Sequence, residues 1–285
     1  MPVREVQSKD NARLKQLRRA LVAPAGGARG IAGSAGGLAG IEGPHLVEEA
    51  LRAGLRVTTI FVERGAERVL EALHVPPETE ILLLPKELLA SALATETPQT
   101  VAALIEPPDW TWAHVLGTRR NGADIVIVLA GLQDPGNLGT ILRSAEAFGA
   151  SGVVSLPGTV SAWNPKAVRA SAGSVFRVPL VAVSERECFE ELHEAGVKVL
   201  ATEARAAKAA ERLDLTGPVA LVIGNEGNGV PAGLAAKADA RITISCPGPV
   251  ESLNAAVAAS VLLYEAARQR AAVVEKPASH RGARR

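Results

Sequence analysis

Polar side chains that could bind a ligand gather in three glycine-containing stretches of the sequence. These stretches carry Asn137 with Arg143, Glu226 with Asn228, and Ser252 with Asn254. Glycine lets a backbone approach a bound molecule closely, because it has no side chain to interfere. The residue types therefore predict a ligand site made of backbone groups and a few polar side chains.

Each of these stretches directly follows an apolar run of the kind that forms a buried strand. The three runs are Ile125–Leu129, Val219–Ile223 and Arg241–Ile244. In open α/β sheets, ligands bind at the carboxyl ends of such strands. The first stretch alone would equally fit a surface turn followed by a helix with a solvated arginine. Its recurrence after two further strands favours one shared site.

The common nucleotide and hydrolase motifs do not account for these loops. The sequence GNEGNG has the wrong glycine order and context for the dinucleotide fingerprint GxGxxG, and the chain contains no GxxxxGK[ST]. It also lacks a GxSxG elbow and the set of motifs of a protein kinase. The candidate site is therefore of another kind.

The three stretches resemble a known family. NLGTILRSAEAFG, VIGNEGNG and ISCPGPVESLNAAVAASVLLYE are similar, in this order, to the three motifs of the SpoU (TrmH-like) RNA 2'-O-ribose methyltransferases, a branch of the SPOUT class. The resemblance covers residues 122–270, and a weaker one covers the N-terminal third. It implies that the protein methylates RNA with S-adenosylmethionine as the cofactor.

The resemblance also implies a role for particular residues. The positions that match the cofactor site are Thr202, Gly224, Ile244 and Leu253. Those that match the active-site polar network are Arg143, Asn137, Glu226, Ser252 and Asn254, although Ser252 could instead simply cap the last helix. For Asn228 we favour an ordinary turn.

Arg143 matches the arginine to which the family assigns activation of the ribose hydroxyl. A guanidinium has a pKa above about 12, so it acts as a base only if it is strongly perturbed. Arg143 could lose its proton beside the substrate phosphate, or stay charged and orient phosphate and hydroxyl. The sequence leaves both interpretations open.

Charge is distributed unevenly along the 285 residues. Residues 1–30 hold seven Lys and Arg against two acidic residues, and residues 265–285 hold six against two, so the middle is acidic although the whole chain has a net charge of +1. Basic ends suit an anionic polymer bound along one surface, although basic tails are often merely solvated. Cys188 and Cys246 show no metal-binding or disulfide spacing, and we expect no metal site. No apolar run is long enough to span a membrane, so we expect a cytoplasmic protein without a membrane partner.

The N-terminal third predicts a small α/β domain over residues 1–106. A basic helix near its start has an apolar stripe of Leu14, Leu17 and Leu21, with Ser8 or Asp10 as its cap. Its other face is expected to contact RNA phosphates through Arg13, Lys15, Arg18 and Arg19. The Gly- and Ala-rich segment 24–40 is expected to be a flexible loop. In the resembled family, a domain of this kind binds RNA.

Residues 107–122 are interpreted as a linker, 123–272 as the methyltransferase domain and 273–285 as a disordered basic tail. Trp110 and Trp112 on the linker are expected to clamp it to a domain surface, in preference to stacking on bases. The alternating pattern predicts a mostly parallel sheet with helices on both faces, including a strand over Phe176–Val183 and a helix from Ser252 to about Arg270. A C-terminal trefoil knot and a homodimer formed by the last helix are implied by the resemblance.

In a homodimer, Lys166, Arg169 and Ser171 could hold the RNA backbone at the other subunit's site. Ribosomal RNA is favoured over transfer RNA because of the N-terminal domain. The alternatives are a transfer RNA 2'-O-methyltransferase and a non-catalytic RNA-binding or ribosome-assembly protein of the same fold. Base methylation is disfavoured by the motif around Arg143.

Overall fold

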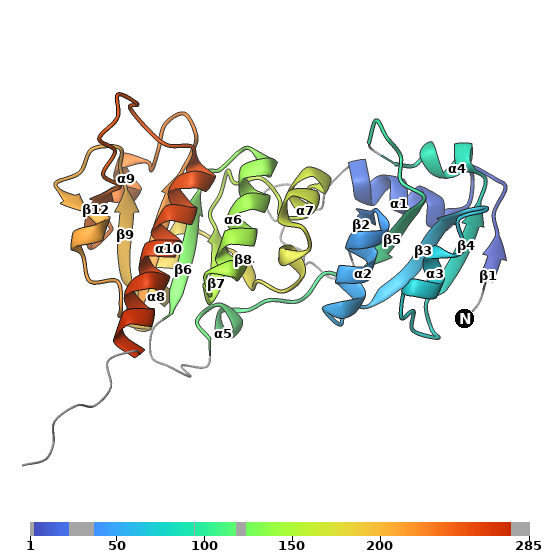
Figure 1. Cartoon of the computed structure of the whole chain (residues 1–285), viewed down its shortest axis with the longest axis horizontal. Helices are drawn as coiled ribbons and strands as arrows, with labels where there is room; N and C mark the ends of the chain where they lie inside the picture. Colours follow the sequence, from blue (N-terminus) through green and yellow to red (C-terminus); the bar gives the residue numbers. More distant parts are fainter. Residues whose placement is uncertain (1–2, 23–36, 94, 118–123, 275–285) are drawn as a thin grey trace, which may run out of the picture. The chain divides into compact units, whose positions relative to one another are not determined.

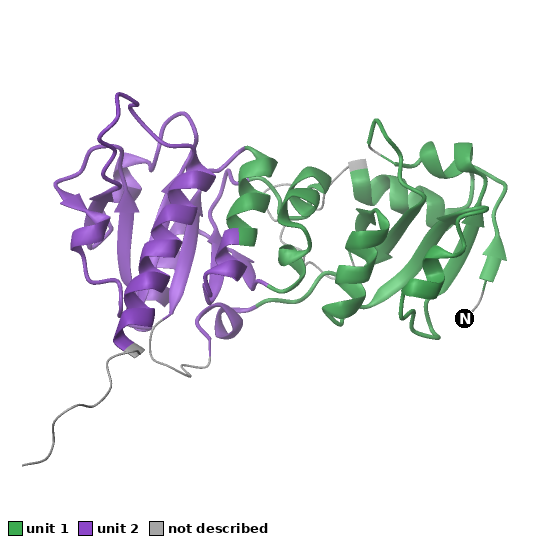
Figure 2. Ribbon diagram, in the orientation of Figure 1, with its two compact units in different colours: residues 1–110, 134–143, 160–177 green, residues 111–133, 144–159, 178–285 purple. Residues whose placement is uncertain are grey.

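The computed structural model describes residues 3–22, 37–93, 95–117 and 124–274 (Figure 1). By its contacts the chain divides into two units (Figure 2). The first unit comprises residues 1–110, 134–143 and 160–177; the second comprises residues 111–133, 144–159 and 178–285. The domain boundaries drawn from the sequence remain a prediction.

The first unit contains a five-stranded mixed sheet with the order β1-β4-β3-β5-β2. Its strands are β1 (Val3–Glu5), β2 (Ala39–Glu42), β3 (Val57–Glu63), β4 (Glu80–Leu84) and β5 (Val101–Ile105). Strands β1, β4 and β3 are parallel, whereas β5 runs antiparallel to both β3 and β2. The helices that follow these strands are α1 (Ala12–Val22), α2 (Pro44–Arg52), α3 (Val69–Ala72) and α4 (Lys86–Ala90).

Helix α1 packs as its apolar stripe predicts. Leu14, Leu17 and Leu21 are buried in one cluster with Phe61 of β3 and Leu82 of β4. The predicted cap is wrong, because the Oδ1 atom of Asn11 accepts the N–H groups of residues 13 and 14. Ser8 and Asp10 lie too early in the chain for this role.

Strand β2 corrects the prediction of a flexible loop over residues 24–40, at least for its last residues. Ala39 and Gly40 are paired with β5, and all four residues of β2 are buried. Small residues have a weak strand propensity, so only the tertiary pairing reveals this strand. Residues 24–36 of the segment lie outside the described residues, as do residues 275–285 of the predicted tail. The disorder predicted for residues 273 and 274 is wrong, because both belong to the last helix.

The second unit contains a seven-stranded sheet with the order β10-β12-β9-β11-β6-β7-β8. Its strands are β6 (Ile125–Ala130), β7 (Gly152–Ser155), β8 (Leu180–Ala182), β9 (Lys198–Thr202), β10 (Lys208–Ala209), β11 (Val219–Gly224) and β12 (Ala240–Thr243). Every pairing between them is parallel. The prediction of an α/β fold with a mostly parallel sheet is therefore confirmed.

The helices of this part of the chain are α5 (Trp112–Val115), α6 (Pro135–Ala147), α7 (Pro165–Ser171), α8 (Glu185–Glu194), α9 (Ala232–Ala235) and α10 (Ala255–Val274), with short 3-10 turns at Ser174–Phe176 and Ala210–Arg212. Helix α6 begins in the first unit and ends in the second, and α7 belongs to the first. Helix α10 packs against β11 and β6. None of the helices in the described ranges is long and apolar enough to cross a membrane.

Two predicted elements differ from the structure in this region. The strand expected over Phe176–Val183 is shorter, because residues 174–176 form the 3-10 turn and β8 starts only after Pro179, which has no N–H group to donate. The expected linker contains helix α5, and Trp112 donates its Nε1–H to Glu187 of α8. That bond confirms the clamp role for Trp112.

Candidate active site

Strands β6 and β11 lie side by side at the point where the order of the second sheet reverses. From β6, the chain continues to β7, which lies next to β6 on one side of this pair. From β11, it continues to β12, which lies on the other side of the pair, beyond β9. Ala130 and Gly224 are the last paired residues of the two strands. In parallel sheets, ligands bind in the crevice at such a switch point.

The loops after β6 and β11 are hydrogen-bonded to one another. Asn225 donates its side-chain N–H to the carbonyl oxygen of Gly131 over 2.9 Å. One residue further, the Oε2 atom of Glu226 accepts the backbone N–H of Gln133 over 3.2 Å. Glu226 thus joins the two loops, and its expected role in the active-site polar network stays a prediction. Asn225 and Gln133 were missed, because their roles depend on the neighbouring loop.

The loop after β11 is a tight turn that folds back on its own strand. Asn225 exchanges backbone hydrogen bonds with Gly229, and its Oδ1 atom accepts the N–H groups of Gly227 and Asn228 over 2.9 Å and 3.2 Å. The turn role favoured for Asn228 is confirmed. A Cβ atom on Gly224 would lie 2.0 Å from the backbone carbon of Gly229, so no side chain fits there.

The other predicted cofactor residues lie at the ends of adjacent strands or directly before α10. Thr202 ends β9, and its hydroxyl donates to the carbonyl of Val222 in β11 over 2.8 Å. Ile244 and Leu253 are apolar and only partly buried. Partly exposed apolar side chains beside bare backbone suit a flat adenosyl group, whose ring needs packing and whose edge needs backbone partners. The residues present therefore fit S-adenosylmethionine.

The start of α10 corrects the expectation of a helix from Ser252. The helix begins at Ala255, and its cap is Asn254, whose Oδ1 atom accepts the N–H groups of residues 256 and 257 over 2.9 Å and 3.2 Å. Ser252 is exposed and lies two residues before the cap. The alternative role of Ser252 as the cap is therefore wrong.

Helix α6 carries the other two predicted catalytic residues. Asp134 caps it, since its Oδ1 atom accepts the N–H groups of Gly136 and Asn137 over 2.5 Å and 3.0 Å. The bond from the Asn137 N–H, together with those from Gly136 and Lys166, lowers the pKa of the Asp134 carboxyl.

Asn137 and Arg143 are six residues apart on α6, which corresponds to about 9 Å along the axis and about 120° around it. Asn137 is partly exposed and Arg143 is exposed. Within the described part of the chain, the Arg143 side chain makes no ion pair or hydrogen bond. Its guanidinium is therefore available to a substrate.

Helix α7 carries the residues that were expected to hold RNA from the other subunit. Arg169 is exposed, whereas Lys166 lies 3.7 Å from the Asp134 carboxylate. Ser171 is fully buried and donates its hydroxyl to the carbonyl of Val168, so the expectation that it contacts RNA is wrong. The helix approaches α6 closely at Gly139, where a Cβ atom would lie 2.4 Å from the Ala167 oxygen.

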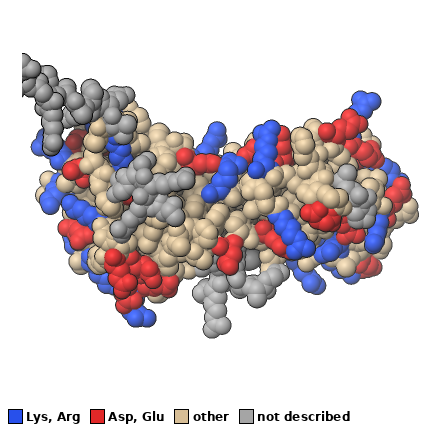
Figure 3. All heavy atoms as spheres, turned by 90° about the horizontal axis from the view of Figure 1, so that it is seen from below, with Lys and Arg blue, Asp and Glu red and all other residues tan. Residues whose placement is uncertain are grey.

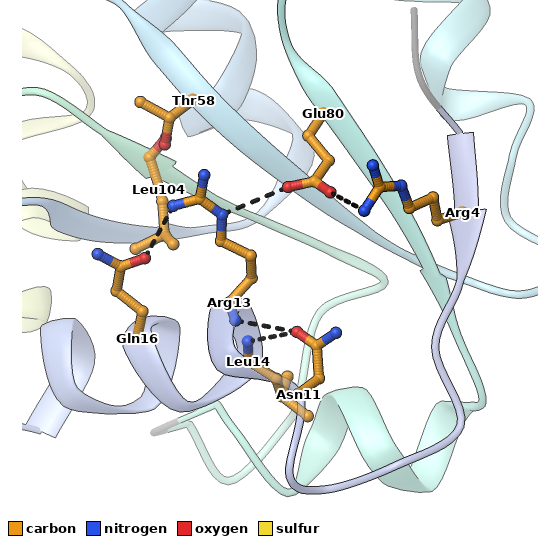
Figure 4. A network of polar contacts seen from close by, with 8 residues as sticks. All are labelled: Arg4, Asn11, Arg13, Leu14, Gln16, Thr58, Glu80 and Leu104. Atoms are coloured by element: carbon orange, nitrogen blue, oxygen red, sulfur yellow. Dashed lines mark hydrogen bonds and ion pairs between the residues drawn. The ribbon is translucent and has the colours of Figure 1, made fainter.

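Most of the cations that were expected to bind RNA on α1 already have partners, and Figure 4 shows those of Arg13. Arg13 lies 3.3 Å from Glu80 and donates to Gln16, and Lys15 lies 2.7 Å from Asp10. Arg18 makes a long hydrogen bond to Ser91, whereas Arg19 is exposed and forms no ion pair with any described residue. Figure 3 shows cations interspersed with acids over the face seen there.

Comparison with known proteins identifies the family. The model of the SpoU rRNA Methylase family matches residues 124–264, and that of the MRM3-like substrate binding domain matches residues 35–103. The Bacillus subtilis 23S rRNA (guanosine(2553)-2'-O)-methyltransferase RlmP is 36% identical over 228 residues, which are 79% of this chain and 86% of that protein. A putative TrmH family tRNA/rRNA methyltransferase of Staphylococcus aureus is 36% identical over 239 residues, 81% of this chain and 96% of its own.

A solved structure shows the same architecture. The SpoU methyltransferase AviRb of Streptomyces viridochromogenes, crystallised with AdoMet, gives a TM-score of 0.78 at 29% identity and covers 92% of this chain and 98% of that one. These similarities confirm the sequence-based prediction of an RNA 2'-O-methyltransferase that uses S-adenosylmethionine. The chain belongs to the SpoU family of RNA methyltransferases.

Proposed function

We propose that this protein methylates a ribose 2'-hydroxyl of ribosomal RNA. The observation that carries the proposal is the pair of hydrogen-bonded loops at the ends of β6 and β11, in a chain of this family. Ribosomal RNA is supported by the similarity to RlmP, whose name specifies 23S rRNA. Such a substrate places the protein in the cytoplasm.

The cofactor site comprises Thr202, Gly224, Ile244 and Leu253. S-adenosylmethionine supplies a methyl group on a sulfonium, which a nucleophile can displace in line. The chain provides packing through Ile244 and Leu253, and Gly224 lets the turn after β11 fold back tightly at the end of the strand. Thr202 fixes the end of β9 against β11 through its bond to Val222.

Arg143 acts on the ribose hydroxyl, with Asn137 on the same helix as its companion. A hydroxyl is a poor nucleophile until its proton is removed or polarised. The exposed guanidinium suits a charged group that orients phosphate and hydroxyl; proton abstraction would need burial by the bound RNA. Orientation alone can lower a barrier by about 7 to 11 kcal/mol in favourable cases.

Glu226, Ser252 and Asn254 complete the polar network. Glu226 holds the loop after β6 through Gln133, and Asn254 fixes the start of α10. Ser252 is exposed in the loop before α10, where its hydroxyl can contact substrate. No metal takes part in this proposal.

The N-terminal residues 1–106 bind the RNA, followed by the linker 107–122 and the methyltransferase domain 123–272. The match of residues 35–103 to a substrate-binding domain supports this role. Contacts to phosphate come from Arg19 first, and from Arg13, Lys15 and Arg18 once RNA displaces their present partners. Arg169 contributes from α7.

The protein acts as a homodimer through α10. Val257, Val261 and Tyr264 are 48%, 39% and 54% exposed and lie at helical spacing, which supports an apolar contact with a second copy. The chain between β11 and α10 also threads a trefoil knot, as in the resembled family. The position of β11 between β9 and β6 supports this topology.

Methyl transfer from labelled S-adenosylmethionine tests the proposal. The purified protein is incubated with 23S rRNA, 16S rRNA and transfer RNA that lack modification, and the labelled product is digested to nucleosides. We expect a labelled 2'-O-methylnucleoside from ribosomal RNA. Label in transfer RNA alone would show that transfer RNA, and not ribosomal RNA, is the substrate. Cofactor binding without label in any RNA, including ribosome precursors, would contradict the proposal.

A further inference from the structure

The backbone of Gly131, the first residue after β6, is held from both sides by side chains of neighbouring loops. Thr159, in the loop after β7, accepts the Gly131 N–H over 3.1 Å and donates its hydroxyl to the Leu129 carbonyl over 3.0 Å. Asn225, in the loop after β11, donates to the Gly131 carbonyl over 2.9 Å. Both polar backbone groups of one residue are thus satisfied by side chains.

Gly131 adopts one of several backbone conformations that are open to a glycine. Its φ angle is +74°, in the left-handed region. Glycine adopts this region about as readily as the regions with negative φ, so the residue type alone does not select it. Beyond the strand, no regular ladder fixes its direction. The hydrogen bonds from Thr159 and Asn225 replace the backbone hydrogen bonds of the sheet and fix one path for the loop.

Only Leu132 and Gln133 separate Gly131 from the cap residue Asp134 and thus from α6. Gln133 is in turn held by Glu226. A change in the path of the chain at Gly131 is therefore passed on, within three residues, to the cap of the helix that carries Asn137 and Arg143. A displacement of about 1 Å in a reacting group can cost about 100-fold in rate.

We propose that Thr159 and Asn225 are positioning residues of this enzyme, which act through Gly131 on the placement of α6 and its catalytic arginine. This inference rests on the proposed function. Neither residue touches the reacting atoms in this account. Their loss should lower kcat and leave the cofactor site, formed by the ends of β9, β11 and β12, largely intact.

The test compares four single variants in the full-length protein. Thr159→Val removes the hydroxyl at constant shape, and Thr159→Ser restores it. Asn225→Asp removes the donor to Gly131 but keeps the acceptor that shapes its own turn. Thr58→Val is the matched control, because the Thr58 hydroxyl donates to the Leu104 carbonyl in the other sheet over 3.2 Å.

We expect Thr159→Val and Asn225→Asp to lower kcat by about 10- to 100-fold. The dissociation constant for S-adenosylmethionine and the KM for RNA should change by less than about 3-fold, since Thr159 lies outside the cofactor loops and Asn225→Asp keeps the acceptor that shapes the turn after β11. Thr159→Ser and Thr58→Val should retain the wild-type kcat. Because both residues act through Gly131, the double variant should lose less than the product of the single losses.

Amide hydrogen exchange gives a second readout that needs no turnover. In Thr159→Val, exchange should accelerate at Gly131 and also in the first turns of α6, residues 138–142, and stay unchanged in Thr58→Val. Acceleration confined to Gly131, or an unchanged kcat in a folded Thr159→Val protein, would overturn the inference. If wild type methylates no RNA, the proposed function fails, and the exchange data still decide whether Thr159 positions α6.

Discussion

The surface around the five-stranded sheet and the strand ends of the seven-stranded sheet use polar side chains in different ways. On the former, charged side chains mostly pair with each other: Glu80 lies 3.6 Å from Arg4 and 3.3 Å from Arg13, and Arg64 lies 2.9 Å from Glu5. At the latter, Thr159, Asn225 and Glu226 bond to backbone groups.

The two patterns have different consequences, one for the binding of RNA and the other for the conformation of loops. Exposed ion pairs contribute little to stability and are screened by salt, so a phosphate can replace one partner. A side chain that bonds to the backbone of another loop fixes the path of that loop, and water replaces it poorly. The first arrangement suits a surface that meets RNA, and the second suits a site that must keep its shape.

The largest expected effect is that of Gly224→Ala. Its Cβ atom would meet the backbone of Gly229 and Val230 at 2.0 Å and 2.2 Å, so the turn after β11 has to move. We expect the free energy of unfolding to fall by about 3 kcal/mol and cofactor binding to be lost. Gly233→Ala is the control, because nothing lies within 4 Å of its Cβ position. Denaturant unfolding and calorimetric titration measure both; equal behaviour of the two variants would contradict the account.

Two arginines of α10 allow the same comparison within one helix, because one bonds to backbone carbonyls and the other forms an ion pair. Arg270 donates to the carbonyls of Leu215, Gly217 and Asp124, whereas Arg268 pairs, among the described residues, only with the Glu265 carboxylate. Burial lowers the pKa of the Arg270 guanidinium, which still remains charged.

We expect Arg270→Met to lower the free energy of unfolding by about 2 kcal/mol, because it leaves carbonyls without donors. Arg268→Met should lower it by less than about 1 kcal/mol. Thermal and denaturant unfolding in low and high salt provide the measurement. A larger loss for Arg268 would reverse the comparison.

Asp134 combines a charge with backbone-directed bonds, so its contribution should depend on pH. Its pKa is lowered in the folded protein, chiefly by the Asn137 N–H, so the charge stabilises the folded state above the ordinary pKa of the carboxyl. That stability is lost as pH falls through the lowered pKa. Relative to Asp134→Asn, wild type should be more stable by about 0.5 kcal/mol at neutral pH, and the difference should vanish once the pH lies below the lowered pKa. A difference that grows on acidification would contradict this sign.

The smallest expected effect is that of Glu80→Gln. The change releases Arg4 and Arg13 from their shared carboxylate, and stability should change by less than about 1 kcal/mol. If these cations meet RNA, affinity at low salt should rise by about 2- to 5-fold and its salt dependence should steepen. Filter binding at several salt concentrations measures this. Unchanged affinity would place RNA elsewhere on the first unit.

Much of the architecture could be predicted because its signals are local. Buried apolar runs followed by glycine turns locate β6, β11 and β12, and the spacing of Leu14, Leu17 and Leu21 locates α1. The caps of α1 and α10 were misjudged because several polar residues compete near each helix start. Only the geometry selects Asn11 and Asn254.

The rest depends on contacts between distant residues, which one sequence does not display. The loop residue Thr159 carries no motif, and its role follows from the position of Gly131 after another strand. Strand β2 is visible only through its pairing with β5. In the same way, nothing in a run of basic residues on α1 shows that Glu80, far along the chain, already neutralises Arg13.

The most direct test of the central claim is methyl transfer by wild type beside Arg143→Ala, with the product identified as a nucleoside and cofactor binding measured in parallel. The account predicts a 2'-O-methylnucleoside in wild type and a loss of at least about 100-fold in rate in the variant, with unchanged cofactor affinity. Arg143→Lys should restore part of the rate if the group acts as a charged orienter. A base-methylated product, or an equal rate without the guanidinium, would contradict the claim.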